Sequence, residues 1–137
     1  MKTRLFVDPS AWYALADKGD ANHTLARDFF PHALAEYRDL VTTNHILGET
    51  YTLIRSRLGY EAVWEFLKRV RQSQRVERIF VTESWEQKAY TLLKRYSDHD
   101  FSFVDGTSFV VMKAIGISDA FAFDRHFSTA GFTTLPH

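Results

Sequence analysis

The segment RLFVDPSAW, residues 4–12, sets a pattern that the rest of the chain repeats. Its apolar centre predicts a buried strand over residues 3–7. Pro9 fits the first turn of a helix and favours an extended conformation for Asp8, which is placed to cap that helix. We therefore predict a strand that passes directly into a short helix over residues 10–16, the unit from which α/β proteins are built.

Short apolar runs alternate with longer helical periodicities to the end of the chain, which predicts βαβ units and a parallel sheet. Further strands are expected at residues 40–42, 76–81, 120–123 and 132–135. Further helices are expected at residues 23–36, 44–58 and 60–73, from a cap at Thr82 or Ser84 to 96, and from 105 to 115. The length of 137 residues, without a repeat or linker, predicts a single domain over residues 1–137.

Several local signals refine these boundaries. Asn44 and Asp105 are expected to cap the helices that they precede. Residues 101–104 form a strand-like apolar run immediately before Asp105. Pro31 is expected to kink or split the helix in which it lies, because proline lacks the backbone donor of a helix interior.

Composition and charge restrict the chemistry. The chain has no cysteine, which excludes disulfides, thiolate metal sites and a thiol nucleophile. It has no signal-like leader and no apolar run near the length of about 20 residues that spans a bilayer, so we expect a soluble cytoplasmic protein. The net charge is zero, which is unusual for a general nucleic-acid binder. Basic residues are concentrated over residues 55–78, where they form either a local phosphate-binding surface or an ordinary solvated helix face.

Four acids occupy comparable positions along the chain. Asp8, Asp105 and Asp124 each follow a strand-like run, and Glu49 lies near the start of the helix after the second strand. The carboxyl ends of parallel strands meet at one edge of a sheet, where α/β proteins place their sites. Acids gathered there stay ionised together only beside a positive partner, most simply a hard divalent cation. The pattern therefore indicates metal-assisted phosphodiester chemistry.

Each acid also has a purely structural explanation. Asp8 and Asp105 can be helix caps that contribute about 1 kcal/mol each. Asp124 can cap a turn, and Glu49 can be a half-exposed helix residue paired with an arginine or lysine. Other chemistries lack their patterns, because G-x-S-x-G, GxxxxGK[ST], GxGxxG and HExxH are all absent.

Other side chains close to these acids have two explanations each. His126 and Arg125 can contact a phosphate or a leaving group, or lie on the surface as capping residues. Trp12 can stack a base, although core packing is the favoured explanation. Hydroxyl groups that can bond to the carboxylates or cap helices belong to Ser10, Thr43, Thr107 and Ser108.

Four segments together resemble the PIN-domain nucleases, and in particular the VapC-type toxins of prokaryotic toxin–antitoxin pairs. The segments are FVDPSAW at residues 6–12, TNHILGETY at 43–51, DFSFVDGTSFVVM at 100–112 and AFAFDRHF at 120–127. They follow the order of the family and extend over nearly the whole chain. The acidic positions of the family fall on Asp8, Glu49, Asp105 and Asp124.

The resemblance implies a three-layer α/β/α sandwich around a short, mostly parallel sheet. It implies that Asp8, Glu49, Asp105 and Asp124 are both the catalytic residues and the ligands of Mg²⁺ or Mn²⁺. It further implies cleavage of single-stranded RNA. A homodimer is expected, and so is a small antitoxin that blocks the acidic pocket with an inserted basic side chain.

Three other interpretations remain open at this point. A Mg²⁺-dependent phosphatase-like enzyme would carry DxD after the first strand, where this chain has Asp8-Pro9-Ser10. A receiver domain would carry an aspartate after the third strand, which ends here in Val81-Thr82. A non-catalytic PIN module that binds RNA or protein is expected to have lost an acid, and all four are present.

Overall fold

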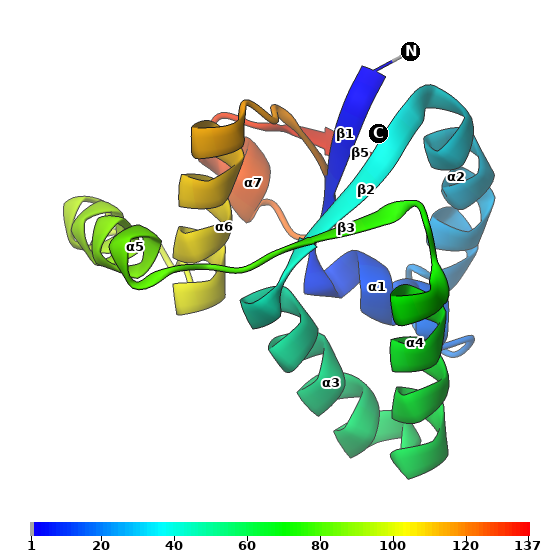
Figure 1. Ribbon diagram of the computed structural model, residues 1–137. Coiled ribbons are helices and arrows are strands. Elements are labelled where there is room, and N and C mark those ends of the chain that lie inside the picture. Colours follow the sequence, from blue (N-terminus) through cyan, green and yellow to red (C-terminus); the bar gives the residue numbers. More distant parts are fainter. Residues whose placement is uncertain (1) are drawn as a thin grey trace.

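A five-stranded sheet, in which all strands are parallel, forms the centre of the molecule (Figure 1). The computed structural model describes residues 2–137. The strand order is β3-β2-β1-β4-β5, so the first strand of the chain lies in the middle of the sheet. The strands are β1 (Lys2–Val7), β2 (Tyr37–Thr43), β3 (Val76–Ile79), β4 (Asp119–Phe121) and β5 (Thr133–Leu135).

Helices cover both faces of this sheet (Figure 1). Helices α1, α2 and α4 lie on one side, α6 and α7 lie on the other, and α5 packs against α6. This arrangement confirms the predicted α/β/α sandwich. No helix of the described chain has both the length and the apolar character needed to cross a membrane. The helices are α1 (Pro9–Ala16), α2 (His23–Glu36), α3 (Asn44–Leu58), α4 (Tyr60–Gln72), α5 (Glu83–Arg95), α6 (Phe103–Ile115) and α7 (His126–Thr129).

The central strands end at one edge of the sheet, and the chain turns there toward the acids. Val7 at the end of β1 pairs with Phe121 at the end of β4. The backbone N–H of Asp8 donates to the carbonyl oxygen of Phe121 at 3.0 Å, so the contact between the two segments continues past the strand. Asp8 and the loop that carries Asp124 therefore leave the sheet side by side, as parallel pairing predicts.

The segment before Asp105 differs from the sequence prediction. Residues 101–104 are not a strand, because Ser102 caps α6, which begins at Phe103. The hydroxyl of Ser102 accepts the N–H of Asp105 at 3.0 Å, and the carboxylate of Asp105 accepts the N–H of Ser102 at 2.9 Å. This reciprocal capping box places Asp105 inside the first turn of α6, so the prediction that Asp105 is the cap residue was wrong.

Two other helix signals also have a different outcome. Thr43, not Asn44, caps α3 by accepting the N–H of Ile46 at 3.1 Å. The side-chain oxygen of Asn44 instead accepts the N–H of Val81 at 2.7 Å, which ties the chain after β3 to the start of α3. Helix α2 continues through Pro31 without a break.

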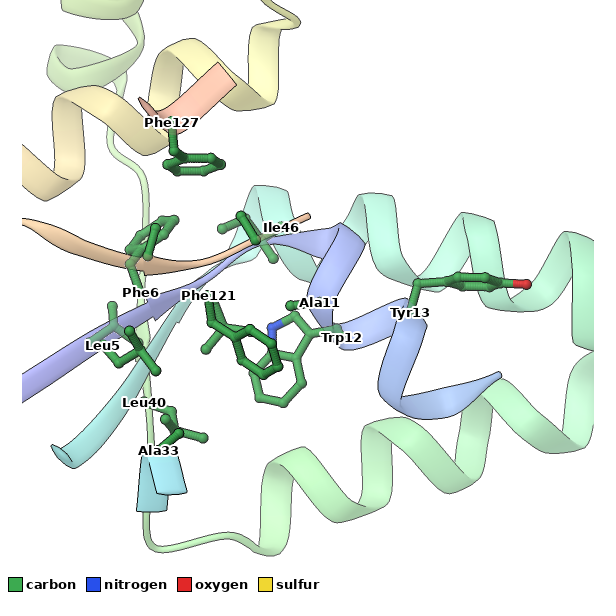
Figure 2. Packing of buried hydrophobic residues seen from close by; sticks show 14 of the residues in the cluster. Leu5, Phe6, Ala11, Trp12, Tyr13, Ala33, Leu40, Ile46, Phe121 and Phe127 are labelled. Carbon is green, nitrogen blue, oxygen red and sulfur yellow. The ribbon is translucent and has the colours of Figure 1, made fainter. Parts of the chain in front are cut away.

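The core fills the space between the sheet and its helices with large side chains. Phe6, Phe109, Phe121 and Phe127 are all at most 1% exposed. Trp12 lies within this buried cluster (Figure 2), with its ring edge-on to that of Phe66 at a centroid distance of 5.7 Å. The favoured explanation of Trp12 as a core residue is therefore confirmed, and it is not available to stack a base.

Candidate metal centre

Asp8 is the most deeply buried acid of the site, with 4% of its surface exposed. Its Oδ2 accepts the backbone N–H of Ser10 at 3.0 Å and the hydroxyl of Ser10 at 2.5 Å. The same hydroxyl oxygen accepts the N–H of Phe123 at 3.0 Å, next to Asp124. Both bonds to Asp8 end on Oδ2, so Oδ1 has no hydrogen-bond partner within residues 2–137.

Asp105 is 5% exposed and is held from two directions. Its Oδ2 accepts the N–H of Ser102 at 2.9 Å and contacts Nδ1 of His126 at 2.7 Å. When the carboxylate of Asp105 is ionised it can only accept a hydrogen bond, and Nδ1 of His126 then carries the proton in this contact. Oδ1 of Asp105, like that of Asp8, has no hydrogen-bond partner in the described chain.

Asp124 and Glu49 are both half-buried. Asp124 lies in the loop between β4 and α7, where its Oδ1 accepts the backbone N–H of His126 at 3.0 Å. Glu49 lies on the second turn of α3, and its carboxylate makes no hydrogen bond to any of residues 2–137. Each acid therefore keeps at least one oxygen that is not engaged by a described protein donor.

Burial, together with the charges of neighbouring acids, raises the pKa of Asp8, Glu49 and Asp105. Burial raises the pKa of Asp8 well above its usual value, and the charge of Asp124 raises it further. Burial likewise raises the pKa of Glu49, with smaller contributions from Asp105 and Asp124. Burial also raises the pKa of Asp105, and the N–H of Ser102 partly offsets this effect. The charges of Asp105 and Asp124 are thus close enough to oppose ionisation of the neighbouring carboxyls.

Lysine and arginine side chains do not relieve this repulsion. Within residues 2–137, no lysine or arginine forms an ion pair with any of the four acids, and His126 is the basic side chain that contacts them. A group of buried and half-buried carboxylates without a lysine or arginine partner has the charge and the open oxygens that a divalent cation requires. The residues present therefore fit a metal ion.

The tightest group of donor atoms comes from Asp105, Asp124 and His126, whose ligand atoms all lie within 4.8 Å of one another. Asp8 and Glu49 lie outside this tight group but are linked to it by the charge interactions described above. Carboxylate oxygens are the ligands that Mg²⁺ and Mn²⁺ prefer. The structure thus places His126 beside two of the predicted acids, Asp105 and Asp124. The sequence had left open whether His126 belongs to the site or is a surface residue.

Of the four hydroxyl groups that the sequence placed near the acids, one bonds to a carboxylate, that of Ser10. Thr43 caps α3, and Thr107 donates to the carbonyl oxygen of Val104 at 3.1 Å. The buried hydroxyl of Ser108 has no hydrogen-bond partner within the described residues. Support of the carboxylates by hydroxyl side chains is therefore concentrated at Asp8.

Sequence analysis did not identify Ser102 as a residue that orients an acid. The spacing S-x-x-D from Ser102 to Asp105 is a capping-box signal and could have revealed it. The contact between His126 and Asp105 joins residues 21 positions apart and has no local signal. It depends on the packing of α7 against α6.

The basic segment over residues 55–78 is only partly available to a ligand. Arg75 donates hydrogen bonds of 2.7 Å to the carbonyl oxygens of Leu34, Tyr37 and Arg38. Its guanidinium therefore holds the backbone where α2 passes into β2. At least one basic side chain of this segment, that of Arg75, therefore stabilises the fold.

The fold and the acidic group together define a class of protein. Residues 5–133 match the PIN domain, and the chain belongs to the PIN-domain family. It is similar to the 23S rRNA-specific endonuclease VapC20 of two Mycobacterium tuberculosis strains, H37Rv and CDC 1551. Each relative is 41% identical over 131 residues, which cover 96% of this chain and 97% of the relative.

A solved structure agrees with this relationship. The crystal structure of M. tuberculosis VapC20, described as a sarcin–ricin-loop-cleaving toxin, matches this chain with a TM-score of 0.87 and 41% identity. The match covers 94% of this chain and 96% of that one. The predicted family and fold are therefore confirmed.

Proposed function

We propose that this protein is a metal-dependent endoribonuclease that hydrolyses phosphodiester bonds of single-stranded RNA. The observation that carries the proposal is the group of four carboxylates at the carboxyl-end edge of the sheet. They come from four separate segments, keep open oxygens and have no lysine or arginine partner in the described chain. Identity of 41% to VapC20 over nearly the full length supports the same activity.

In this proposal Asp8, Glu49, Asp105 and Asp124 hold Mg²⁺ or Mn²⁺ and are the catalytic residues. When bound, such an ion lowers the pKa of a coordinated water and offsets the charge that develops on the phosphate. The protein fixes the ligands: Ser10 orients Asp8 through two bonds to Oδ2. Bonds from Ser102 and His126 orient Asp105 in the same way and leave its other oxygen open.

The activity of the relatives suggests the first substrate to test. VapC20 is described as acting on 23S rRNA and as cleaving the sarcin–ricin loop. Because the similarity extends over 96% of this chain, we propose the same ribosomal RNA loop as a substrate of this protein.

A cleavage assay tests the activity. RNA containing the sarcin–ricin loop is incubated with the protein in Mg²⁺, in Mn²⁺ and in chelator, and the products are sized. We expect cleavage with either ion, products with a 5′ phosphate and a 3′ hydroxyl, and none in chelator. Asp124→Asn should lower kcat/KM by at least about 100-fold, more than is usual for a residue that only orients a ligand.

The matched control is Asp28→Asn, which removes an exposed carboxylate that pairs with Arg27 outside the site. Its activity should equal that of the unaltered protein. Cleavage that persists in chelator, or full activity of Asp124→Asn, would count against metal-dependent catalysis. Cleavage in chelator would indicate a nuclease of another type. No cleavage under any condition would indicate a non-catalytic module.

We further propose that the protein is a cytoplasmic toxin of a type II toxin–antitoxin pair, that it forms a homodimer, and that a small antitoxin inhibits it. Four acids without a lysine or arginine partner are suited to an inserted arginine, which can bind carboxylates through two parallel bonds. Co-expression with the neighbouring open reading frame should suppress cleavage. Sedimentation of the purified protein should give twice the mass of one chain, and a monomer at all concentrations would refute the dimer.

A further inference from the structure

The connection between α5 and α6 carries an ordered group of rings that the proposed reaction does not use. The ring of His99 is stacked on that of Phe101, with a centroid distance of 5.1 Å and an interplanar angle of 11°. Tyr96 lies edge-on to both, with its centroid 5.6 Å from that of His99 and 6.2 Å from that of Phe101. We refer to Tyr96, His99 and Phe101 as the ring cluster.

Phe101 connects the ring cluster to the acidic site. Its ring is edge-on to that of His126, at 5.6 Å and 80°, and His126 in turn contacts Asp105 at 2.7 Å. Phe101 also packs edge-on against Phe109, which is 1% exposed, and is thereby anchored in the core. One ring therefore separates His99 from the histidine that contacts the acids.

The outer part of the ring cluster is open to solvent. The side chain of His99 is 37% exposed although Phe101 is stacked against it, and Tyr96 is 40% exposed. The exposed ring of His99 is thus connected to Asp105 through Phe101 and His126. Unpaired RNA bases are commonly bound by stacking on aromatic and histidine side chains.

The charges around His99 indicate which part of a nucleotide would lie there. Asp98 and Asp100 flank it and are exposed, and Oδ1 of Asp98 is 3.8 Å from Nε2 of His99. These carboxylates repel a phosphate group. The group that fits is therefore the uncharged face of a base.

We propose that His99, supported by Phe101, is a base-stacking subsite for a nucleotide next to the scissile phosphate. The proposal rests on the proposed ribonuclease function and adds a positioning residue to it. His99 does not touch the reacting atoms; it fixes the base beside them and so determines which phosphate reaches the acids. If the ring cluster only shielded Phe101 from water, cleavage would not depend on the base of the nucleotide next to the scissile phosphate.

Kinetics on the RNA of the cleavage assay provide the first test. His99→Ala should raise KM about ten-fold, equivalent to about 1.4 kcal/mol, with little change in kcat. His99→Phe keeps a flat ring and should restore KM. The matched control Tyr60→Ala removes another exposed ring, at the first position of α4, and should change neither parameter. Tyr60 follows the end of α3, about 20 Å along that helix from its start.

An abasic nucleotide identifies the partner of His99. Placed beside the cut, it should raise KM of the unaltered protein as much as His99→Ala does, with no further rise in the variant. An unchanged KM in His99→Ala would overturn the proposal. So would a penalty from each abasic position that is as large in the variant as in the unaltered protein.

Binding without cleavage separates this inference from the proposed function. Stacking on an aromatic ring quenches 2-aminopurine fluorescence, so a short single-stranded RNA with this base near its centre is titrated in chelator. We expect quenching by the unaltered protein and its loss in His99→Ala, with equal melting temperatures. If no RNA is cut but this difference is seen, the nuclease proposal fails and the stacking subsite stands. Normal cleavage with equal quenching in both proteins would refute the subsite alone.

Discussion

The two most buried carboxylates each bind the protein through one oxygen only. Asp8 and Asp105 both use Oδ2 for their hydrogen bonds, and Oδ1 has no partner in the described chain. A carboxylate fixed in this way presents its second oxygen in one direction before any ligand arrives. The entropy of ordering the ligands is then lost during folding and not during binding, which favours tight association.

Asp8→Asn tests what this arrangement costs the metal-free protein. Because burial and the charge of Asp124 raise the pKa of Asp8, ionisation of Asp8 destabilises the folded state. In chelator at neutral pH, the variant should have the higher free energy of unfolding, by on the order of 1 kcal/mol for each unit by which the pKa is raised. Urea unfolding measures the difference.

The destabilisation by ionised Asp8 predicts how the stability of the metal-free protein changes with pH. A carboxyl whose pKa is higher in the folded than in the unfolded chain binds more protons when folded. Metal-free stability should therefore fall as the pH rises from the ordinary value of 3.8 through the raised pKa of Asp8. Asp8→Asn should flatten this slope, whereas the exposed control Asp28→Asn should keep it. Equal slopes in all three proteins would show that ionised Asp8 is not destabilising.

The sequence predicted which acids gather but not how they are held. Asp8 and Asp124 follow apolar strands that lie side by side, so the strand pattern alone placed them at one edge of the sheet. The engaged oxygens depend on hydroxyl rotamers and on the capping box of Ser102, which the apolar pattern does not encode. The bond from His126 to Asp105 requires the final packing of two helices, and no local pattern specifies that.

At the level of helices, a close contact between α5 and α6 depends on Gly106. A Cβ atom at this position would lie 2.8 Å from Cγ of Leu93. Gly106→Ala should therefore lower the free energy of unfolding by about 1–3 kcal/mol through overpacking, despite the better helix propensity of alanine. Small size at this position is therefore required by the packing of α6 against Leu93 of α5.

The matched control is Gly48→Ala on α3, where a Cβ would meet no heavy atom within 4 Å. This substitution should raise stability by about 0.5–1 kcal/mol, because alanine loses less backbone entropy in a helix. Thermal melts of both variants in chelator measure the contrast. Similar stabilisation by both substitutions would mean that Leu93 moves aside freely and that α5 is not fixed at this contact.

Helices with a clear apolar stripe and strands with a buried apolar run were predictable, whereas the first turn of α6 and the single-turn helix α7 were not. The helices around Glu49 and along residues 60–72 carry clear stripes, and their predicted bounds agree with the structure to within one residue. The strand-like interpretation of residues 101–104 was wrong because a run of four mostly apolar residues fits a strand and a first helical turn equally well. Helix α7, His126–Thr129, is a single turn and has no periodicity to detect.

At the level of the whole molecule, the strand order creates the site. Placing β1 between β2 and β4 brings Asp8 between the helix that carries Glu49 and the loop that carries Asp124, although these acids are far apart in the chain. Helix α6 brings Asp105 from outside the sheet. No single segment of the chain therefore contains the site, and its charge repulsion exists only in the folded state.

Metal binding and folding should therefore be linked, with a defined pH dependence. An ion that binds only the folded chain stabilises it by about 2.7 kcal/mol at one hundred times its dissociation constant, which raises Tm by roughly 10 °C for a domain of this size. The gain should be large at pH 8, where fewer protons compete with the ion for the carboxylates. It should be small at pH 5, where protons compete for carboxyls whose pKa values are raised. Scanning calorimetry with Mn²⁺ at both pH values measures the difference, and Asp124→Asn should reduce the gain at pH 8. A gain that is independent of pH, or that persists in this variant, would place the ion away from these carboxylates.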